Sequence, residues 1–287
     1  MKEAADITVV LTAYKRVDSL RKQLEAIEKQ SLKPAEIWLF QDRVVKDYTI
    51  TIDNGLLERF DHVQIERQNA GVWGRFQFAR SARTAYVCIF DDDTIPGSRW
   101  LENCLTHMQK QRGIYGTIGI VSTSAETYVN NGHVRVGWAR PNEVAREVDF
   151  VGHSWFLETQ WLEYMFDGTK RYQAFKYAAE DMTLSYACQK HGIHTYVPPH
   201  PSRDKEWWGS YPDTALQLGV SAEALSLSGN EERMERAFTA LIGDGWSILL
   251  KRNPAYVAEC RRDENRYRRK RKMETVKRVL LRRWKSI

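Results

Sequence analysis

The stretch YVCIFDDDTIPG, residues 86–97, joins a short apolar run to three consecutive aspartates and a turn. An apolar run with β-branched and aromatic side chains predicts a buried strand. Three carboxylates at the end of such a strand repel one another and lose water, so folding alone gives no reason for them. A bound cation would supply that reason.

The triplet has a geometry that suits one ion. Alternate side chains of an extended segment point the same way, so Asp91 and Asp93 can converge on one ion. Asp92 would then turn elsewhere, toward the backbone or toward the ribose of a bound nucleotide. Carboxylate oxygens bind Mg²⁺ and Mn²⁺, and such ions keep places for water and substrate phosphates. The alternative is that the acids only cap a helix that begins near Ser98, for which one acid would suffice. The triplet therefore favours a divalent cation, Mn²⁺ or Mg²⁺, beside a nucleotide diphosphate.

Strand and helix patterns alternate on both sides of the triplet. DITVVLTAY, AEIWLFQD and AYVCIFDDD predict strands, and the helical spacing of Leu20, Leu24 and Ile27 predicts a helix between the first two. This alternation predicts an α/β fold with a mostly parallel sheet flanked by helices. Ligands bind outside the carboxyl ends of such strands, where Asp42 and the triplet lie.

The pattern is less regular after residue 122. EVDFVGHSWFLETQWLEYMF predicts a strand, a turn and an aromatic helix, EDMTLSYACQKHG a helix that ends at Gly192, and IHTYVPP one more strand. Residues 198–230 are rich in Pro, Gly, Ser and Trp. We expect them to form a long loop with little regular structure, of the kind that often serves as a lid.

Length and composition are those of a globular protein. The chain has 287 residues, of which 43% are hydrophobic, enough for a substantial core. No stretch is apolar enough to span a membrane, and the first apolar run is too short for a secretion signal, so we expect a cytoplasmic location. The four cysteines are widely spaced, which predicts neither a disulfide framework nor a zinc site.

The positive charge is concentrated at the C-terminus. Residues 259–287 hold 13 Lys+Arg and 4 Asp+Glu, a net of +9, which leaves −3 for the rest of a chain whose net charge is +6. If helical, this tail aligns Met273, Val276, Leu280, Trp284 and Ile287 in one stripe. A basic amphipathic helix is typical of peripheral membrane binding, so residues 261–287 are expected to contact an anionic membrane surface. Packing on the body or on a partner chain, and RNA binding, are the alternatives; nucleic acid is the less expected partner.

Five stretches in order resemble the family-two glycosyltransferases and their relatives with the GT-A fold. VVLTAYKR resembles their first strand, WLFQD the second strand, NAGVWGRFQFAR the Gly and Arg stretch before the metal strand, and IFDDDTIPG the DxD motif. AAEDMTLSYACQKHGIHTYVPP is similar to the ED motif with its helix and following strand. Each string alone is weak, but five in this order over about residues 6–200 are specific together.

The resemblance implies a metal-dependent, inverting hexosyl- or pentosyltransferase of polysaccharide biosynthesis. Its donor would be a nucleoside-diphosphate sugar, with UDP expected first, dTDP second because it presents the same imide edge, and GDP less. Its acceptor would be a hydroxyl of a glycan or of a lipid-linked molecule. The implied nucleotide-binding residues are Thr12, Ala13, Tyr14, Arg16, Asp42 at the base, Asn69, Gly71 and Arg75 near the ribose and diphosphate, and Asp91 and Asp92. Arg80 and Arg83 are rivals for the phosphate contact, unless this helix face is only solvated.

A second carboxylate pair, Glu180 and Asp181, begins a predicted helix. Inverting transfer needs a carboxylate that takes the proton from the acceptor hydroxyl. The resemblance assigns this role to Asp181 and acceptor binding to Glu180, and helix capping is the alternative. It also suggests His200 as a third metal ligand beside Asp91 and Asp93.

Further residues have weaker assignments. Arg203 and Lys205 are candidates for the diphosphate, and Trp207, Trp208 and Tyr211 for stacking on a sugar. GHSWF corresponds to an acceptor-side turn, with Gly152, with His153 as a polar contact or a buried residue, and with Trp155 as a sugar platform or a core residue.

We expect a catalytic domain over residues 1–230 and a helical extension over 231–287. The nucleotide-binding half would span 1–122 and the acceptor-binding half 123–230. Two other functions remain open. A sugar-1-phosphate nucleotidylyltransferase would also use acids on Mg²⁺, but no Gly-rich phosphate loop follows the first strand. A noncatalytic carbohydrate- or nucleic-acid-binding protein would leave both carboxylate pairs unexplained.

Overall fold

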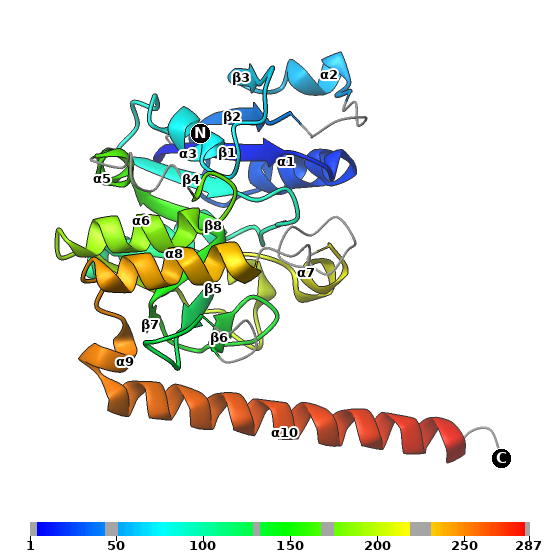
Figure 1. Cartoon of the computed structure of the whole chain (residues 1–287). Helices are drawn as coiled ribbons and strands as arrows, with labels where there is room; N and C mark the ends of the chain where they lie inside the picture. The colour runs from blue at the N-terminus through cyan, green and yellow to red at the C-terminus, as the bar shows by residue number, and fades with distance from the viewer. Residues whose placement is uncertain (1–4, 44–50, 129–132, 168–174, 219–230, 285–287) are drawn as a thin grey trace.

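A nine-stranded sheet forms the centre of the molecule (Figure 1). The computed structural model describes residues 5–43, 51–128, 133–167, 175–218 and 231–284, with side chains of the last helix described to Met273. In spatial order the strands are β3 (His62–Ile65), β2 (Pro34–Gln41), β1 (Ala5–Ala13), β4 (Tyr86–Phe90), β8 (Phe150–Glu158), β5 (Gly113–Val121), β9 (His194–Val197) and β7 (Arg146–Val148), and β6 (Val134–Gly137) pairs with β5.

The sheet is parallel in its first half and mixed in its second. β1 pairs in parallel with β2 and β4, and β2 with β3. β8 runs antiparallel between β4 and β5, whereas β5 and β9 are parallel. The predicted α/β architecture is thus confirmed, with its parallel order kept in the strands that precede the aspartates. The antiparallel β8 brings its first residues next to the end of β4.

Helices cover both faces of this sheet. They are α1 (Leu20–Glu28), α2 (Asn54–Leu57), α3 (Gly74–Ala79), α4 (Trp100–Lys110), α5 (Leu162–Phe166), α6 (Glu180–Gln189), α7 (Pro212–Leu218), α8 (Glu231–Gly243), α9 (Leu249–Arg252) and α10 (Pro254–Trp284), with 3₁₀ turns at Val17–Ser19, Thr159–Trp161 and Lys205–Trp207. On β4, Cys88 contacts Trp100 of α4. The next residue, Ile89, pairs with Trp155, which packs on Phe76 of α3. Because successive strand residues point to opposite faces, α4 and α3 cover opposite faces.

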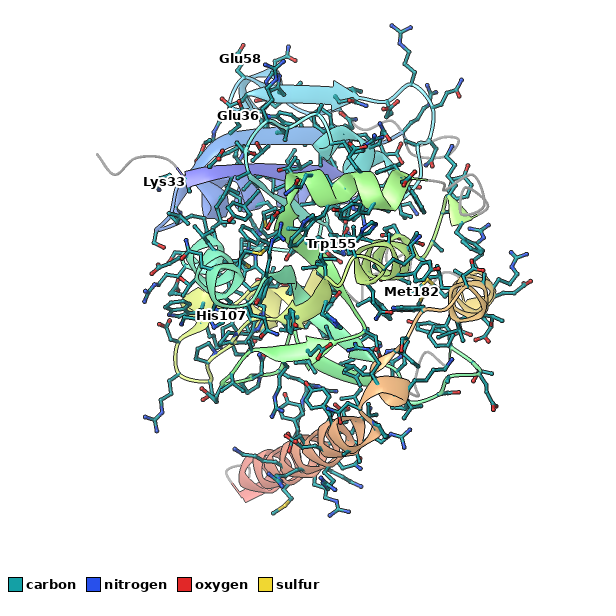
Figure 2. The ribbon with its side chains drawn as sticks, turned by 90° about the vertical axis from the view of Figure 1, so that its left-hand side faces the viewer. Lys33, Glu36, Glu58, His107, Trp155 and Met182 are labelled. Carbon is teal, nitrogen blue, oxygen red and sulfur yellow. The ribbon has the colours of Figure 1, made fainter. Side chains whose placement is uncertain are left out.

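The core is rich in aromatic side chains and extends past the predicted domain boundary. Trp155 lies in the interior of the molecule (Figure 2), and it is 2% exposed. Phe238 of α8 and Trp246 belong to the same cluster of buried apolar residues. The core therefore includes described residues after position 230, and the first part of α10 also belongs to it. The four cysteines are buried and reduced.

The segment after β9 is more ordered than expected. It contains a 3₁₀ turn and helix α7, so the prediction of little regular structure was wrong for residues 198–218; residues 219–230 lie outside the described part. Asn103 Nδ2 donates to the carbonyls of Pro199 and Trp207, both at 2.8 Å. The Gly97 N–H donates to Trp208 O at 2.9 Å. These hydrogen bonds attach the segment to the start of α4, whereas a hinged lid would have to separate from the body.

Helix α10 runs along one end of the molecule and extends past the body (Figure 1). Val257 and Cys260 are buried, and Arg140 forms an ion pair with Glu264. Farther along, Met273 is 62% exposed. The other stripe residues, Val276, Leu280, Trp284 and Ile287, have side chains outside the described part. None of the described helices is long and apolar enough to cross a membrane.

Candidate active site

The carboxyl ends of β1, β2 and β4 meet at one edge of the sheet. Leu11 of β1 is in register with Phe90 of β4, and Ala13 with Gln41 of β2. The residues that follow these strands must therefore share this edge. Asp42 follows β2 directly, and its N–H donates to Ala13 O at 3.1 Å. The triplet follows β4, so the two acidic positions predicted from sequence lie on the same side of the sheet.

Asp92 faces the loop after β1. Its Oδ2 accepts a hydrogen bond from the Arg16 N–H at 3.3 Å, and its Oδ1 lies 2.7 Å from Arg16 Nη2. The backbone of the triplet is held from below, because Gln23 Nε2 donates to Asp91 O at 2.6 Å and the Ser19 hydroxyl donates to Asp92 O. From sequence Ser19 is only a possible helix cap and Gln23 is not singled out, since polar residues at a helix start look like ordinary surface positions.

Asp91, Asp93 and His153 form a group that can hold a metal ion. One ligand atom from each residue lies within 4.8 Å of the others. His153 Nδ1 lies 3.1 Å from Asp93 Oδ1, and the Asp91 N–H donates to His153 O at 3.0 Å. The last bond arises because β8 runs antiparallel beside β4. Two carboxylates and an imidazole are a donor set that fits a divalent cation.

The stretch Gly152–Phe156 is part of strand β8 and not a turn, so that expectation was wrong. His153 has φ +65°, which is uncommon for a residue with a Cβ, and it lies where the pairing of β8 with β5 is irregular. Trp138, also at positive φ, stacks on the His153 ring with 5.8 Å between centroids. From sequence His153 is a polar contact or a buried residue. Only the pairing of β8 with β4 shows that it lies beside the aspartates.

His200 is not part of this group. It is fully buried, its Nδ1 donates to Pro198 O at 3.0 Å, and its Nε2 accepts from the Gly209 N–H at 3.1 Å. Burial lowers its pKa to about 4, so the ring is a neutral core group between Trp100 and Trp208. The structure therefore assigns the third position beside Asp91 and Asp93 to His153, because packing has already used both nitrogens of His200.

Asp93 and His153 shift the pKa of each other in opposite directions. Burial acts to raise the pKa of Asp93, but His153 and Arg16 hold it below its ordinary value. Burial acts to lower the pKa of His153, but Asp93 raises it above its ordinary value. These shifts favour an ion pair between His153 and Asp93. A metal bound to the ring nitrogen would have to displace the ring proton.

Glu180 and Asp181 begin α6. The N-cap residue of α6 is Ala179, at φ +62°, and it makes no side-chain cap hydrogen bond. The same holds for Arg99, the N-cap residue of α4, which is the helix that the triplet was alternatively expected to cap. Asp181 Oδ1 accepts from the Met182 N–H at 2.7 Å. Burial, followed by Glu180, raises the pKa of Asp181 well above its ordinary value. A carboxylate with a raised pKa is suited to accept a proton near neutral pH.

Two of the predicted nucleotide-binding residues, Tyr14 and Asn69, lie near Asp42. Its Oδ1 accepts from the Ala70 N–H at 2.8 Å, and burial raises its pKa. Tyr14 lies against Asn69 and Asp42. The hydroxyl of Thr12 is buried and makes no hydrogen bond within the described part of the chain. Polar groups of β1, β2 and the loop before α3 thus surround one position.

Other predicted binding residues are occupied elsewhere. Trp155 is a core residue, with the Arg75 guanidinium 4.9 Å from its ring centroid. Trp208 is 3% exposed, and its Nε1 donates to Pro201 O at 2.7 Å. Trp207 packs under the guanidinium of Arg99, 4.1 Å from its ring centroid. Arg203, Lys205 and Arg83 are exposed, and the Tyr211 hydroxyl donates to Glu206.

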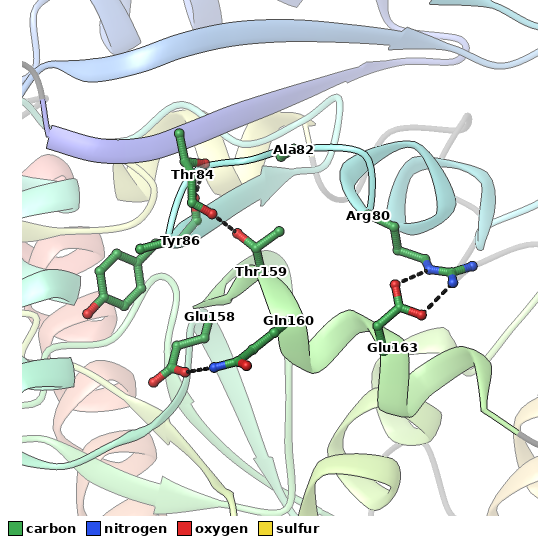
Figure 3. Close-up of a pocket in the computed structure, with 9 residues that line it drawn as sticks. Arg80, Ala82, Thr84, Tyr86, Glu158, Thr159, Gln160 and Glu163 are labelled. Carbon is green, nitrogen blue, oxygen red and sulfur yellow. Dashed lines mark hydrogen bonds and ion pairs between the residues drawn. The ribbon is translucent and has the colours of Figure 1, made fainter.

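A pocket of about 510 Å³ lies at the opposite end of β4 (Figure 3). It is lined by Arg80, Ala82, Thr84, Ala85, Tyr86, Glu158, Thr159, Gln160 and Glu163. Arg80 Nε donates to Glu163 Oε1 at 2.9 Å, and the Thr159 hydroxyl donates to Thr84 O at 2.6 Å. Its polar groups bond one another and no acidic cluster lines it. We therefore place the chemistry at the aspartate edge.

A family model and two solved structures are similar to this chain. A model of the family described as Glycosyl transferase family 2 matches residues 8–163. Among solved structures, TarS of S. aureus matches with 16% identity and a TM-score of 0.45, over 67% of this chain and 36% of that chain. A structure of S. aureus TarS 1–349 in complex with UDP matches with 16% identity and a TM-score of 0.44, over 67% of this chain and 59% of that chain.

The chain thus spans less than two thirds of either TarS structure. No curated protein sequence matches it. The family match covers more than half of the chain and contains the triplet, Asp42 and His153. The protein is therefore a member of glycosyl transferase family 2, with the GT-A fold.

Proposed function

We propose that the protein transfers a sugar, with inversion, from a nucleoside-diphosphate sugar to a hydroxyl of a glycan or lipid-linked acceptor. One observation carries this proposal: the group of Asp91, Asp93 and His153 lies beside the pair Glu180 and Asp181, since Arg75 contacts both Asp91 and Glu180 and Asp181 interacts with Asp91. Nucleotidylyl transfer and noncatalytic binding, which were open from sequence, find no support in the family match.

A divalent cation on Asp91, Asp93 and His153 fits the proposal. Carboxylates suit both Mg²⁺ and Mn²⁺, and an imidazole nitrogen favours the transition metal Mn²⁺. When bound, the cation would stabilise the negative charge of the leaving nucleoside diphosphate. Arg16 forms ion pairs with Asp92 and Asp93, so its guanidinium would lie beside the bound diphosphate.

Asp181 is proposed as the base. It takes the proton from the acceptor hydroxyl, and the oxygen then attacks the anomeric carbon from the face opposite the leaving group. The bond from that carbon to the diphosphate oxygen breaks, and its electron pair leaves with the nucleotide. Glu180 is proposed to orient the acceptor side of the site.

The nucleotide is proposed to be UDP, with dTDP second. Asp42 would accept the imide N–H of either base, and Thr12, Tyr14 and Asn69 would line the same position, with the backbone at Gly71 close by. The tail at residues 261–287 would hold the enzyme at an anionic membrane that carries the acceptor. Arg203 and Lys205 remain proposals for the diphosphate only if their exposed side chains turn inward.

A panel of nucleotide sugars with Mn²⁺ tests the proposal. We expect slow release of free nucleotide from one donor, which depends on the metal and is faster with an acceptor. Pyrophosphate-dependent cleavage to a nucleoside triphosphate would instead support a nucleotidylyltransferase.

Two variants test the assigned roles of Asp181 and Asp93 in the same assay. Asp181→Asn should keep donor binding and lose transfer by about 100-fold or more, and normal transfer would remove Asp181 as the base. Asp93→Ala should abolish the Mn²⁺ dependence of nucleotide binding; unchanged dependence would contradict the metal site.

A further inference from the structure

Arg75 lies beneath the site rather than beside the position expected for a nucleotide. It belongs to α3, and its side chain is 9% exposed. Its Nη2 lies 3.0 Å from Asp91 Oδ1 and donates to Glu180 Oε1 at 2.6 Å. The guanidinium also packs on the ring of Trp155, 4.9 Å from the centroid. One nitrogen of Arg75 thus joins the metal strand to the helix that carries the base.

In the described part of the chain, no strand pairing joins these two carboxylates directly. Asp91 follows β4, and Glu180 begins α6, which the chain enters through the left-handed residue Ala179. Such a backbone conformation persists only where surrounding contacts hold it. The position of Glu180 therefore depends on side-chain and loop contacts and not on strand pairing.

The loop before α3 supplies a second contact of the same kind. The Val72 N–H donates to Lys176 O at 3.1 Å. Gly71, at φ +74°, lies so close to this segment that a Cβ would be 2.2 Å from Lys176 O. Residues 71–75 therefore contact residues 176–180 twice, once through the backbone and once through the Arg75 side chain.

The charge of Arg75 is as important as its shape. Burial raises the pKa of Glu180, Arg75 lowers it, and Asp91 raises it again. Without the guanidinium, two carboxylates would face each other in a poorly solvated place. Like charges there repel strongly, and each would shift position or take up a proton.

We propose that Arg75 is a positioning residue that fixes Glu180, and through it Asp181, relative to Asp91, and that it does not bind the nucleotide. This inference rests on the proposed function of the same site. It replaces the place near the ribose and diphosphate that the sequence suggested for Arg75. Glu180 is then held in place by an arginine as well as facing the acceptor.

Arg75→Met, Glu180→Gln and the double variant test this inference. We expect Arg75→Met to bind UDP without metal within about twofold of wild type, because it loses no nucleotide contact. Its kcat with the donor from the panel should fall about 100-fold or more, with little change in the donor KM. Arg75→Lys should recover part of the kcat, since an ammonium can reach one of the carboxylates.

The double variant decides whether Arg75 acts through Glu180. If it does, Arg75→Met/Glu180→Gln should be no slower than the slower single variant, because the two residues act as one unit. The denaturant midpoints should be non-additive in the same way. This second measurement needs no substrate and tests the contact itself. The double variant also removes the Glu180 carboxylate that would face Asp91, so of this pair only Asp91 loses its guanidinium partner, and the variant should fold even if Arg75→Met does not.

Arg80→Met is the matched control. From sequence Arg80 was a rival for the phosphate contact, but it pairs with Glu163 in the pocket at the opposite end of β4. Its replacement removes an arginine at the end of the same helix and should leave UDP binding and kcat unchanged. A higher donor KM or weaker UDP binding in Arg75→Met, or losses that multiply in the double variant, would overturn the inference. A wild-type enzyme inactive with every donor, but with the expected coupling in the unfolding data, would instead refute the proposed function.

Discussion

Two arginines neutralise only part of the charge at the aspartate edge. Arg16 pairs with Asp92 and Asp93, and Arg75 pairs with Asp91 and Glu180. The carboxylates of the triplet and of the Glu180–Asp181 pair outnumber these guanidinium groups. The remaining negative charge is poorly hydrated, because most of these side chains are buried. A divalent cation would lower the energy of the cluster and would be attracted to it for the same reason.

Two histidines should respond in opposite ways to substitution. His153→Ala should weaken Mn²⁺ binding in the presence of UDP by about tenfold or more, because a ligand is lost, and should change stability little. His200→Ala should lower the free energy of unfolding by about 2–4 kcal/mol, because it leaves a cavity and unpaired groups, and should leave Mn²⁺ affinity unchanged. Metal titration and denaturant unfolding of both variants measure this. The reverse pattern would restore His200 as the ligand.

Substitutions at two glycines with positive φ distinguish the cost of backbone strain from the cost of a steric clash. Gly71 has φ +74° and lies against Lys176 O, whereas Gly192 has φ +73° and open space around it. Gly192→Ala should cost about 1 kcal/mol of stability from strain alone. Gly71→Ala should cost about 2 kcal/mol more, because the backbone must move, and should also weaken UDP binding. Equal costs in denaturant unfolding would mean that the Lys176 contact is not constrained.

At the scale of elements, one buried carboxylate joins the sheet to the C-terminal segment. Asp149 lies between β7 and β8, and its two oxygens accept from the Ser122 N–H at 2.7 Å and the Leu249 N–H at 2.6 Å. It thereby fixes the start of α9 against the end of β5. Burial raises its pKa to about 6, although both N–H groups and Arg252 oppose the change.

This raised pKa predicts how stability depends on pH. Between about pH 4 and pH 6 the native state binds a proton at Asp149 that the unfolded state does not bind. The contribution of Asp149 is therefore greatest below this range and falls by about 3 kcal/mol as pH rises through it. Relative to Asp149→Asn, which cannot ionise, wild type should lose this amount between pH 4 and pH 7. Parallel curves for the two proteins in denaturant unfolding would contradict the prediction.

At the scale of the whole molecule, α10 has two different parts. Near the body its acids face arginines, since Arg146 pairs with Glu259 and Asp263, and Arg140 with Glu264. The basic residues Arg269, Lys270 and Lys272 are exposed. The helix thus uses its acids for packing and presents its bases to solvent. This separation of charge is what a helix bound to an anionic surface needs.

Shortening α10 should separate packing from surface binding. A chain that ends at Lys272 keeps the contacts of Val257, Cys260 and Tyr267, so its Tm should stay within about 2 °C of wild type. It should bind anionic vesicles at least about tenfold more weakly, since each lost basic residue near the surface contributes about 1 kcal/mol. Vesicle sedimentation at low and high salt measures this, with neutral vesicles as the control. Equal binding by both chains would assign the surface to another part of the molecule.

The sequence by itself determined the strands of the first half, the place of the aspartate triplet and Asp42 at strand ends, and the start of the ED helix. These features are local, because hydrophobic periodicity and the residues that end an element act over a few positions. The α/β class followed from their alternation.

Only the tertiary structure decided which distant side chains complete the site. Antiparallel pairing of β8 with β4 brings His153 to the aspartates, packing encloses His200 and Trp155, and Arg75 turns inward to two carboxylates. Periodicity records which residues are buried, but not which neighbour they meet, because that depends on strand order and on the packing of elements far apart in the chain.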